Sequence, residues 1–196
     1  MTAPAAPAWS TDRWFNTAAP LTLDALRGRV VMLHAFQMLC PGCVSHGIPQ
    51  AQRVARQFAD APVTVVGLHT VFEHHDVMGP EALAVFLQEY RVTFPVAVDR
   101  PGLSGDTTPQ TMRAYRMRGT PTVVLIDAVG RLRQQVFGIY DDLHLGRDLG
   151  SLVAEATLSV AAVQGPYTQG ITTAGLSHLQ GWRQPPAFFR TPAKAP

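Results

Sequence analysis

The apolar residues of this chain follow two kinds of pattern, which alternate along it. Two runs, 30–36 and 63–69, are almost continuously apolar, which is typical of strands buried on both faces of a sheet. Between them, residues 43–59 place apolar side chains three and four positions apart, which predicts an amphipathic helix that Pro49 should kink. A strand, a helix and a strand in this order predict a right-handed crossover with parallel strands.

Similar patterns continue after residue 70. The expected elements are a helix at 79–90, a short strand at 94–98, a short helix at 109–117, a strand at 120–126, its antiparallel hairpin partner at 132–137, and a helix from about 143 to 158. Together these elements predict an α/β fold in which helices flank a central mixed sheet.

Composition shifts at both ends of the chain predict three parts. Residues 1–19 are expected to form an N-terminal extension, flexible over 1–12, with Trp14 and Phe15 packed onto the body. The domain itself should span 20–163. Residues 164–196 form a Pro- and Gly-rich C-terminal extension that either drapes over the body or is partly disordered.

Length and charge exclude several classes of protein. With 196 residues, 46% of them hydrophobic, the chain can bury one good core. The net charge is +2 without a basic run, so a nucleic-acid partner is not expected. No apolar run approaches the roughly 20 residues of a membrane span. The first residues lack a basic region followed by an apolar core, so we expect a cytoplasmic protein, or an extracytoplasmic one if a signal peptide preceded this start.

The two cysteines of the chain form one motif, Cys40-Pro41-Gly42-Cys43, between the first apolar run and the helix that follows it. Free N–H groups and the positive dipole end of that helix favour a thiolate at Cys40, and such thiols have pKa values of about 7 or lower. The motif therefore predicts thiol–disulfide exchange in which Cys40 attacks and Cys43 resolves the mixed disulfide. No metal or organic cofactor is required for this chemistry.

Two other interpretations of the cysteine pair remain open. It could be inert, although Pro41 and Gly42 disfavour a position inside a helix or strand. It could also contribute to a metal site, since structural zinc takes four ligands. Candidate partners for such a site, or for a metal held by the later loop alone, are His46, His69, Glu73, His74, His75 and Asp76.

His34 interrupts the first apolar run. If the strand register holds, it lies beneath the dithiol, where a neutral imidazole can accept the proton of Cys43. The alternative is a buried histidine bonded to a backbone carbonyl.

Other residues near the motif have more than one interpretation. Phe36 either lies beneath the active-site turn or packs only in the core, and His46 is expected to face solvent. Three arginines just before Pro121 either offer a positively charged rim to an acidic substrate or form a solvated helix face: Arg113, Arg116 and Arg118.

Three features in order carry a family resemblance: the strand with Cys40-Pro41-Gly42-Cys43, Thr120-Pro121 opening a strand, and a hairpin that ends at Gly138. Over roughly residues 20–160 the chain resembles the thioredoxin superfamily. The resemblance implies that Pro121 is cis and lies beside the dithiol. It also implies that Thr120 offers backbone groups to a bound substrate, and it places Pro41, Gly42 and Phe36 in the substrate site.

The spacing of the motifs refines this resemblance. Between Cys43 and Pro121 lie 77 residues, which leaves room for an extra helix and strand at 79–98. This insertion is similar to TlpA/ResA-type thiol-disulfide oxidoreductases and to AhpC/TSA-related redoxins. The loop that follows Gly67-Leu68-His69-Thr70 is similar to the thioredoxin-like domain of DipZ-type proteins.

Some positions depart from these families. Leu39 replaces the usual aromatic residue, and His34 replaces a buried acid or Asn. Gln37 and Leu33 stand where peroxiredoxins have Thr and Pro. The resemblance implies a thiol-disulfide oxidoreductase, specifically a protein-disulfide reductase. Its partners would be a protein or small-molecule disulfide and a reductant, either a thioredoxin reductase-like enzyme or a thiol donor. The alternatives are a peroxiredoxin-like hydroperoxide reductase and a non-catalytic or metal-binding thioredoxin-fold protein.

Overall fold

The computed structural model describes residues 3–103 and 106–163 of the chain. The chain divides into two units after Val163, and the predicted C-terminal extension, 164–196, lies outside the described residues. Among the described residues, no helix has both the length and the apolar character that crossing a bilayer requires.

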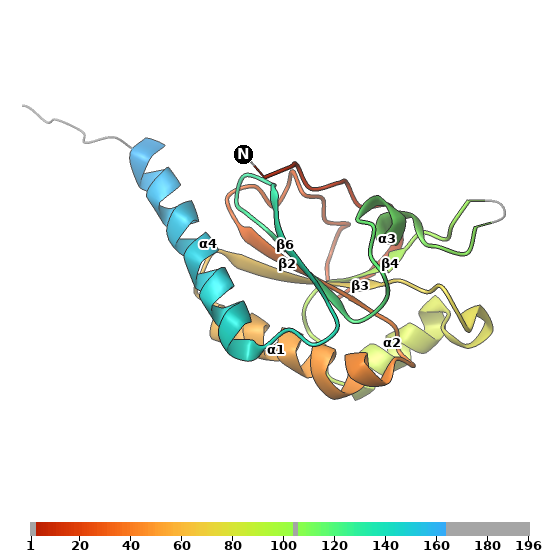
Figure 1. Cartoon of the computed structure of the whole chain (residues 1–196). Coiled ribbons are helices and arrows are strands. Elements are labelled where there is room, and N and C mark those ends of the chain that lie inside the picture. Colours follow the sequence, from red (N-terminus) through yellow and green to blue (C-terminus); the bar gives the residue numbers. More distant parts are fainter. Residues whose placement is uncertain (1–2, 104–105, 164–196) are drawn as a thin grey trace, which may run out of the picture. The chain divides into compact units, whose positions relative to one another are not determined.

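A six-stranded mixed sheet forms the centre of the first unit (Figure 1), with the strand order β1-β4-β3-β2-β5-β6. The strands are β1 (Thr11–Phe15), β2 (Val30–Phe36), β3 (Val63–His69), β4 (Val96–Asp99), β5 (Thr122–Ile126) and β6 (Leu132–Phe137). Strands β2, β3 and β4 run parallel, whereas β5 is antiparallel to β2 and pairs with β6 as a hairpin. The predicted α/β fold and its central crossover are confirmed.

Helices cover both faces of this sheet. They are η1, a π-helical stretch (Cys43–Gly47), α1 (Ile48–Gln57), a short 3₁₀ turn η2 (His75–Val77), α2 (Pro80–Glu89), α3 (Gln110–Ala114) and α4 (Asp142–Val163). Helices α1, α2 and α4 lie on one face and α3 lies on the other (Figure 1). The predicted insertion between the cysteine motif and the Pro121 strand is α2 with β4.

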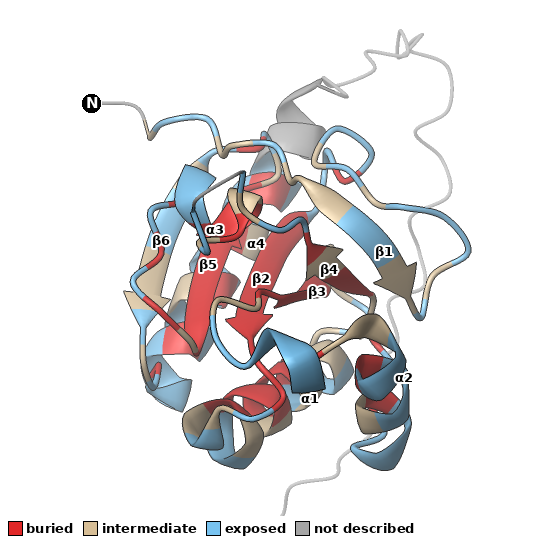
Figure 2. Ribbon diagram, turned by 90° about the vertical axis from the view of Figure 1, so that its right-hand side faces the viewer, coloured by how far each residue is buried: buried red, intermediate tan, exposed pale blue. Residues whose placement is uncertain are grey.

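Strand β2 is buried along its whole length, because it lies in the middle of the sheet with helices on both sides (Figure 2). Successive side chains of a strand point to opposite faces. Met32 and Phe36 therefore pack under α1, α2 and α4, while Leu33 packs under α3. His34 is two residues after Met32, so its side chain points to the same face of the sheet, which the cysteine helix covers.

The N-terminal segment is part of the sheet, contrary to the prediction of a flexible lead in an extension up to residue 19. Strand β1 pairs antiparallel with β4, and Trp14 and Phe15 pack against the core as expected. Before it, Ala6 donates its N–H to the carbonyl of Gly130. The segment TDRWF is too short to show a period of its own, and its order comes from pairing with a strand far along the chain.

Pro49 disrupts the cysteine helix in a specific way. The N–H of Ile48 donates to the carbonyl of Cys43, five residues back, and this wider turn defines η1. Proline has no N–H to donate and crowds the preceding turn. A π-helical stretch is one way in which a helix accommodates such a residue, and such stretches are frequent at functional sites. The sequence predicted a kink at Pro49; the structure shows a π-helical stretch beside Cys43, which ends where the regular helix that contains Pro49 begins.

Candidate active site

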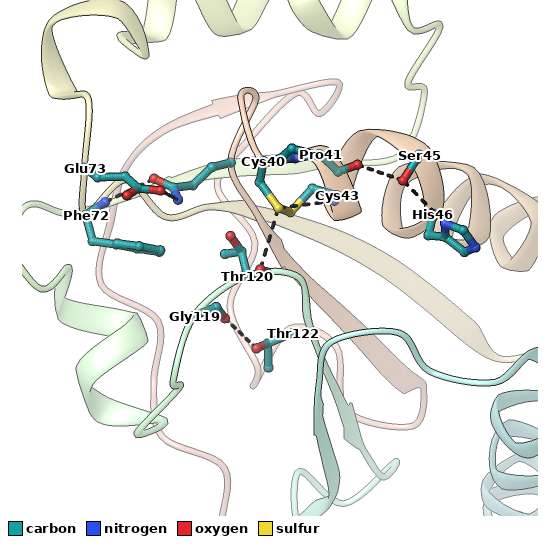
Figure 3. Close-up of a disulfide and its surroundings, with 11 residues drawn as sticks. Cys40, Pro41, Cys43, Ser45, His46, Phe72, Glu73, Gly119, Thr120 and Thr122 are labelled. Atoms are coloured by element: carbon teal, nitrogen blue, oxygen red, sulfur yellow. Dashed lines mark hydrogen bonds between the residues drawn. A yellow bond between two sulfur atoms is a disulfide. The ribbon is translucent and has the colours of Figure 1, made fainter.

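Cys40 and Cys43 form a disulfide at the point where the loop after β2 enters the helix (Figure 3). Cys40 is partly exposed, whereas Cys43 is fully buried. The backbone N–H of Cys43 lies 3.2 Å from the sulfur of Cys40. In the reduced protein this N–H can donate to a Cys40 thiolate, which is the stabilisation that a nucleophilic thiol requires.

The Thr120-Pro121 peptide bond is cis, and it lies beside the cysteine pair as the resemblance implies. The carbonyl oxygen of Thr120 is 3.6 Å from the sulfur of Cys40 (Figure 3). A Cβ added to Gly42 would lie 3.4 Å from Cδ of Pro121, so the turn of the motif faces the proline ring at van der Waals distance. Segments 80 residues apart thus meet around Cys40.

A groove of about 460 Å³ opens beside Cys40. One wall is the loop after β3, with Phe72, Glu73 and His74, and the other is formed by Thr120 and Phe137. The guanidinium of Arg118 lies 5.0 Å from the centre of the ring of Phe137, which is one of the side chains that line the groove. Arg113, by contrast, forms an ion pair with Asp106. The predicted positive rim of Arg113, Arg116 and Arg118 stays a prediction, because none of the three is among the described residues that line the groove.

Gln37 joins the two sides of the groove floor, a role that sequence reasoning missed. Its side chain is buried, its Oε1 accepts from the N–H of Phe72 at 3.3 Å, and its Nε2 donates to Glu73 at 3.3 Å. The amide therefore ties the active-site loop to the loop after β3. The sequence signal was a polar residue three positions before Cys40, but its partners lie more than 30 residues away.

His34 is fully buried in β2, and its ring lies against Gly47 in the helix that follows the motif. Neither ring nitrogen has a hydrogen-bond partner in the part of the chain that the structure describes, so the alternative of a carbonyl-bonded histidine does not hold. Burial lowers the pKa of His34 to about 4, because the imidazolium form would lose its solvation. The imidazole is thus neutral at physiological pH and has a free lone pair.

Phe36 does not fit the predicted substrate site. Its ring is completely buried and stacks parallel to the His34 ring, with 5.9 Å between the ring centres. It also contacts His69 and Phe86. A side chain without exposed surface cannot touch a substrate, so Phe36 belongs to the core that supports the site.

The other candidate histidines do not converge. His69 is buried in β3, whereas His74 and His75 are exposed on the following loop. Within residues 3–103 and 106–163, no three His, Cys, Asp or Glu side chains are placed to hold a metal ion. His46 is exposed, and its Nδ1 lies 3.4 Å from Oγ of Ser45.

This geometry defines a thioredoxin-like fold of the thiol-disulfide oxidoreductase and isomerase type, with a Cys-x-x-Cys pair at disulfide distance. The chain belongs to the AhpC/TSA family, whose model matches residues 4–135. The match includes β1, which agrees with the place of that strand in the sheet.

Solved structures and curated relatives agree with this assignment. The chain is 52% identical to a thiol-disulfide isomerase from Corynebacterium glutamicum, with a TM-score of 0.72 over 76% of this chain and 97% of that one. A crystallised thioredoxin-like superfamily protein is 53% identical, with a TM-score of 0.74 over 77% of this chain and 97% of that one. Protein DipZ of Mycobacterium bovis is 30% identical over 127 residues, which are 64% of this chain but only 17% of DipZ.

Proposed function

We propose that this protein reduces disulfide bonds in other proteins, with Cys40 as the nucleophile and Cys43 as the resolving thiol. The observation that carries the proposal is the asymmetry of the pair. Cys40 is partly exposed beside a groove and faces the N–H of Cys43, while Cys43 is buried beneath it. The similarity to a protein described as a thiol-disulfide isomerase supports the same chemistry.

The reaction proceeds through two exchanges. The Cys40 thiolate attacks one sulfur of the substrate disulfide, so that a Cys40–substrate bond forms and the substrate bond breaks, and the released thiolate takes a proton. The Cys43 sulfur then attacks Cys40, which forms the Cys40–Cys43 disulfide and releases the second substrate thiol. Two electrons pass from the protein to the substrate, and an external dithiol or thiol donor must restore the reduced pair.

His34 is proposed to accept the proton of Cys43 as that thiol attacks. A buried thiol is a poor nucleophile until it loses its proton. The neutral His34 imidazole lies on the face of the sheet that the cysteine helix covers, and its ring stacks on Phe36, which belongs to the same core cluster as Cys43. Among the described residues, neither ring nitrogen has a hydrogen-bond partner. General-base help contributes roughly 10²–10⁴-fold to a rate when the pKa of the base lies near the working pH, so the low pKa of His34 places its contribution at the lower end of this range.

Substrate is proposed to enter the groove beside Cys40 and to meet the backbone of Thr120. The carbonyl of Thr120 lies next to the attacking sulfur, and Pro41 and Gly42 form the turn that faces Pro121. One feature of the groove, the carboxylate of Glu73, supports the reducing direction. Glu73 is the carboxylate in its lining, and a nearby negative charge disfavours the Cys40 thiolate of the reduced protein. A less stable reduced form is a stronger reductant.

Trapping of the mixed disulfide tests this proposal. Cys43→Ser should accumulate a covalent complex with a disulfide substrate such as insulin, whereas Cys40→Ser should not. The wild-type protein should reduce insulin with dithiothreitol as donor. Trapping by the Cys40→Ser variant instead would reverse the assigned roles. If the wild-type protein consumed hydrogen peroxide rapidly and left insulin unreduced, a hydroperoxide reductase would replace the proposal.

A further inference from the structure

Opposite charges lie near the two walls of the groove beside Cys40. Glu73 belongs to the lining, on the wall that the loop after β3 forms. Phe137 belongs to the opposite wall, and the guanidinium of Arg118 lies 5.0 Å from the centre of its ring. Because Cys40 also lines the groove, a substrate that presents a disulfide to this thiol comes close to both walls.

Neither charge has an ion-pair partner in the part of the chain that the structure describes. The ion pairs there join other residues, as between Arg13 and Glu81. Glu73 accepts a hydrogen bond from the uncharged amide of Gln37 at 3.3 Å, and the guanidinium of Arg118 lies over an aromatic ring. Both side chains are exposed, so each can pair with a charged group of another molecule.

The loop that carries Glu73 is held in place before a substrate binds. The buried amide of Gln37 accepts from the N–H of Phe72 at 3.3 Å and donates to Glu73 at the same distance. Further along the loop, the N–H of Val77 donates to the carbonyl of His74 at 3.2 Å. A charged group that is already positioned loses little conformational freedom when it binds a partner, so Glu73 is suited to recognition.

Exposed apolar side chains accompany these charges. Leu39 is 58% exposed and Phe137 is 45% exposed, and both line the groove together with Met78. Large apolar side chains left exposed beside a reactive group favour a polypeptide partner over a small, fully hydrated disulfide. The groove, with a volume of about 460 Å³, has room for the residues on either side of a substrate cysteine.

We propose that this groove selects polypeptide substrates by the order of the charged residues around their reactive cysteine. A basic residue on one side of that cysteine pairs with Glu73, and an acidic residue on the other side lies near Arg118. The inference rests on the proposed function, because it requires that Cys40 attack a disulfide in a polypeptide. Matched charges of this kind fix orientation and raise the rate of association more than they raise affinity.

Two peptides of identical composition, with capped ends, test this selection. One carries lysine before its single cysteine and glutamate after it, and the other has these two residues exchanged, so both are neutral overall. Each cysteine is joined to 2-mercaptoethanol by a disulfide. The pre-reduced protein should reduce one peptide about three- to tenfold faster than the other, measured as second-order rate constants after acid quenching. Rate constants for dithiothreitol correct for the intrinsic reactivity of each disulfide.

Exchanging the charges on the protein is the decisive variant. Glu73→Arg combined with Arg118→Glu keeps the net charge and should reverse the preference. Because both peptides receive electrons from the same cysteine pair, any change in its reduction potential cancels in the ratio. The control combines Asp76→Arg with Arg116→Glu, at exposed positions outside the groove lining, and should keep the wild-type preference. If the first combination unfolds the protein, Glu73→Gln should lower the preference about twofold.

The outcomes separate the two proposals. Failure to reduce both peptides and insulin would remove the proposed function. Equal rates for the two peptides would leave that function intact and overturn the charge selection, as would a preference that the Glu73 and Arg118 variants leave unchanged. A reversal by the control combination would overturn it too, because the preference would then come from the general field of the surface. Reduction of insulin alone would also overturn it, since a groove that selects local charges must accept a short segment.

Salt gives a second measurement on the wild-type protein. At 1 M salt the Debye length falls to about 3 Å, so the preference for one peptide should shrink towards equal rates. A preference that is the same at low and high salt would show that shape, and not charge, distinguishes the two peptides.

Discussion

Gly47 lies directly against the His34 imidazole. A Cβ added to this glycine would lie 2.5 Å from Cε1 and 2.8 Å from Nε2 of the ring. The backbone of Gly47 has φ −62° and ψ −52°, which any residue can adopt. The glycine is therefore required by the space that the histidine occupies, and not by the backbone conformation.

Gly47→Ala should push the His34 ring out of its place. Overpacking of this kind costs about 1–3 kcal/mol, so the free energy of unfolding of the oxidised protein should fall by that amount. Resolution of a mixed disulfide should slow in parallel. Gly146→Ala, in helix α4, is the control, because a Cβ there meets no atom of the described residues within 4 Å. It should be neutral or stabilising by up to about 1 kcal/mol. Equal effects of both substitutions in urea unfolding would contradict the contact.

The stability of the protein should fall as the pH is lowered from 6.5 to about 4. Burial lowers the pKa values of His34 and His69 from 6.5 to about 4. In this window the unfolded chain binds protons that the folded chain does not, so the free energy of unfolding decreases with falling pH. Each histidine can contribute about 3 kcal/mol across the whole window.

Urea unfolding at several pH values checks this dependence. His69→Leu should make the curve between pH 6.5 and 4.5 clearly less steep, because one of the two proton-linked groups is gone. His75→Gln, at an exposed position, should leave the slope unchanged. A wild-type protein that is equally stable at pH 6.5 and 4.5 would show that the two histidines are not held neutral by burial.

Gln37→Leu should weaken substrate binding more than turnover. The substitution leaves the N–H of Phe72 and the carboxylate of Glu73 without their amide partner, so the wall of the groove loses its attachment. Loss of these bonds should cost about 1–3 kcal/mol of stability. In insulin reduction we expect KM to rise severalfold with a smaller change in kcat. The control is Gln57→Leu, on the exposed side of α1. If kcat fell and KM stayed the same, Gln37 would not be the residue that holds the wall of the groove in place.

Much of this fold follows from local patterns. The apolar runs of β2 and β3 and the helical period between them define the crossover, and the position of Cys40 at the end of β2 then places the thiol at the edge of the sheet. The face of the sheet on which His34 lies could be predicted because side chains alternate regularly along a strand. Strand β1 could not be predicted, because it is ordered by its pairing with β4 and not by its own five residues.

The contacts that complete the site depend on distant segments. Gln37 meets Glu73 only because β2 and β3 are neighbours whose ends coincide. His69 was a candidate for a metal loop, yet it is the last residue of β3 and its ring packs against Phe36. None of these relationships has a signature within a single stretch of sequence.

Glu73→Gln should make the cysteine pair a weaker reductant. The substitution removes a negative charge from the lining of the groove beside Cys40, while an amide oxygen can still accept from Gln37. The Cys40 thiolate of the reduced form is then less destabilised, so the reduction potential should rise. Because the carboxylate is exposed, the expected rise is only about 10 mV.

Equilibration with glutathione, read by thiol alkylation, measures this potential. The wild-type value should lie nearer to about −270 mV than to −120 mV if the protein acts as a reductant. Asp76→Asn removes an exposed charge from the same loop but outside the groove lining, so it should shift the potential less. Salt should shrink the effect of Glu73→Gln, because screening weakens interactions between exposed charges. If both substitutions shift the potential equally, the effect comes from net charge, and Glu73 does not set the reducing strength of the pair.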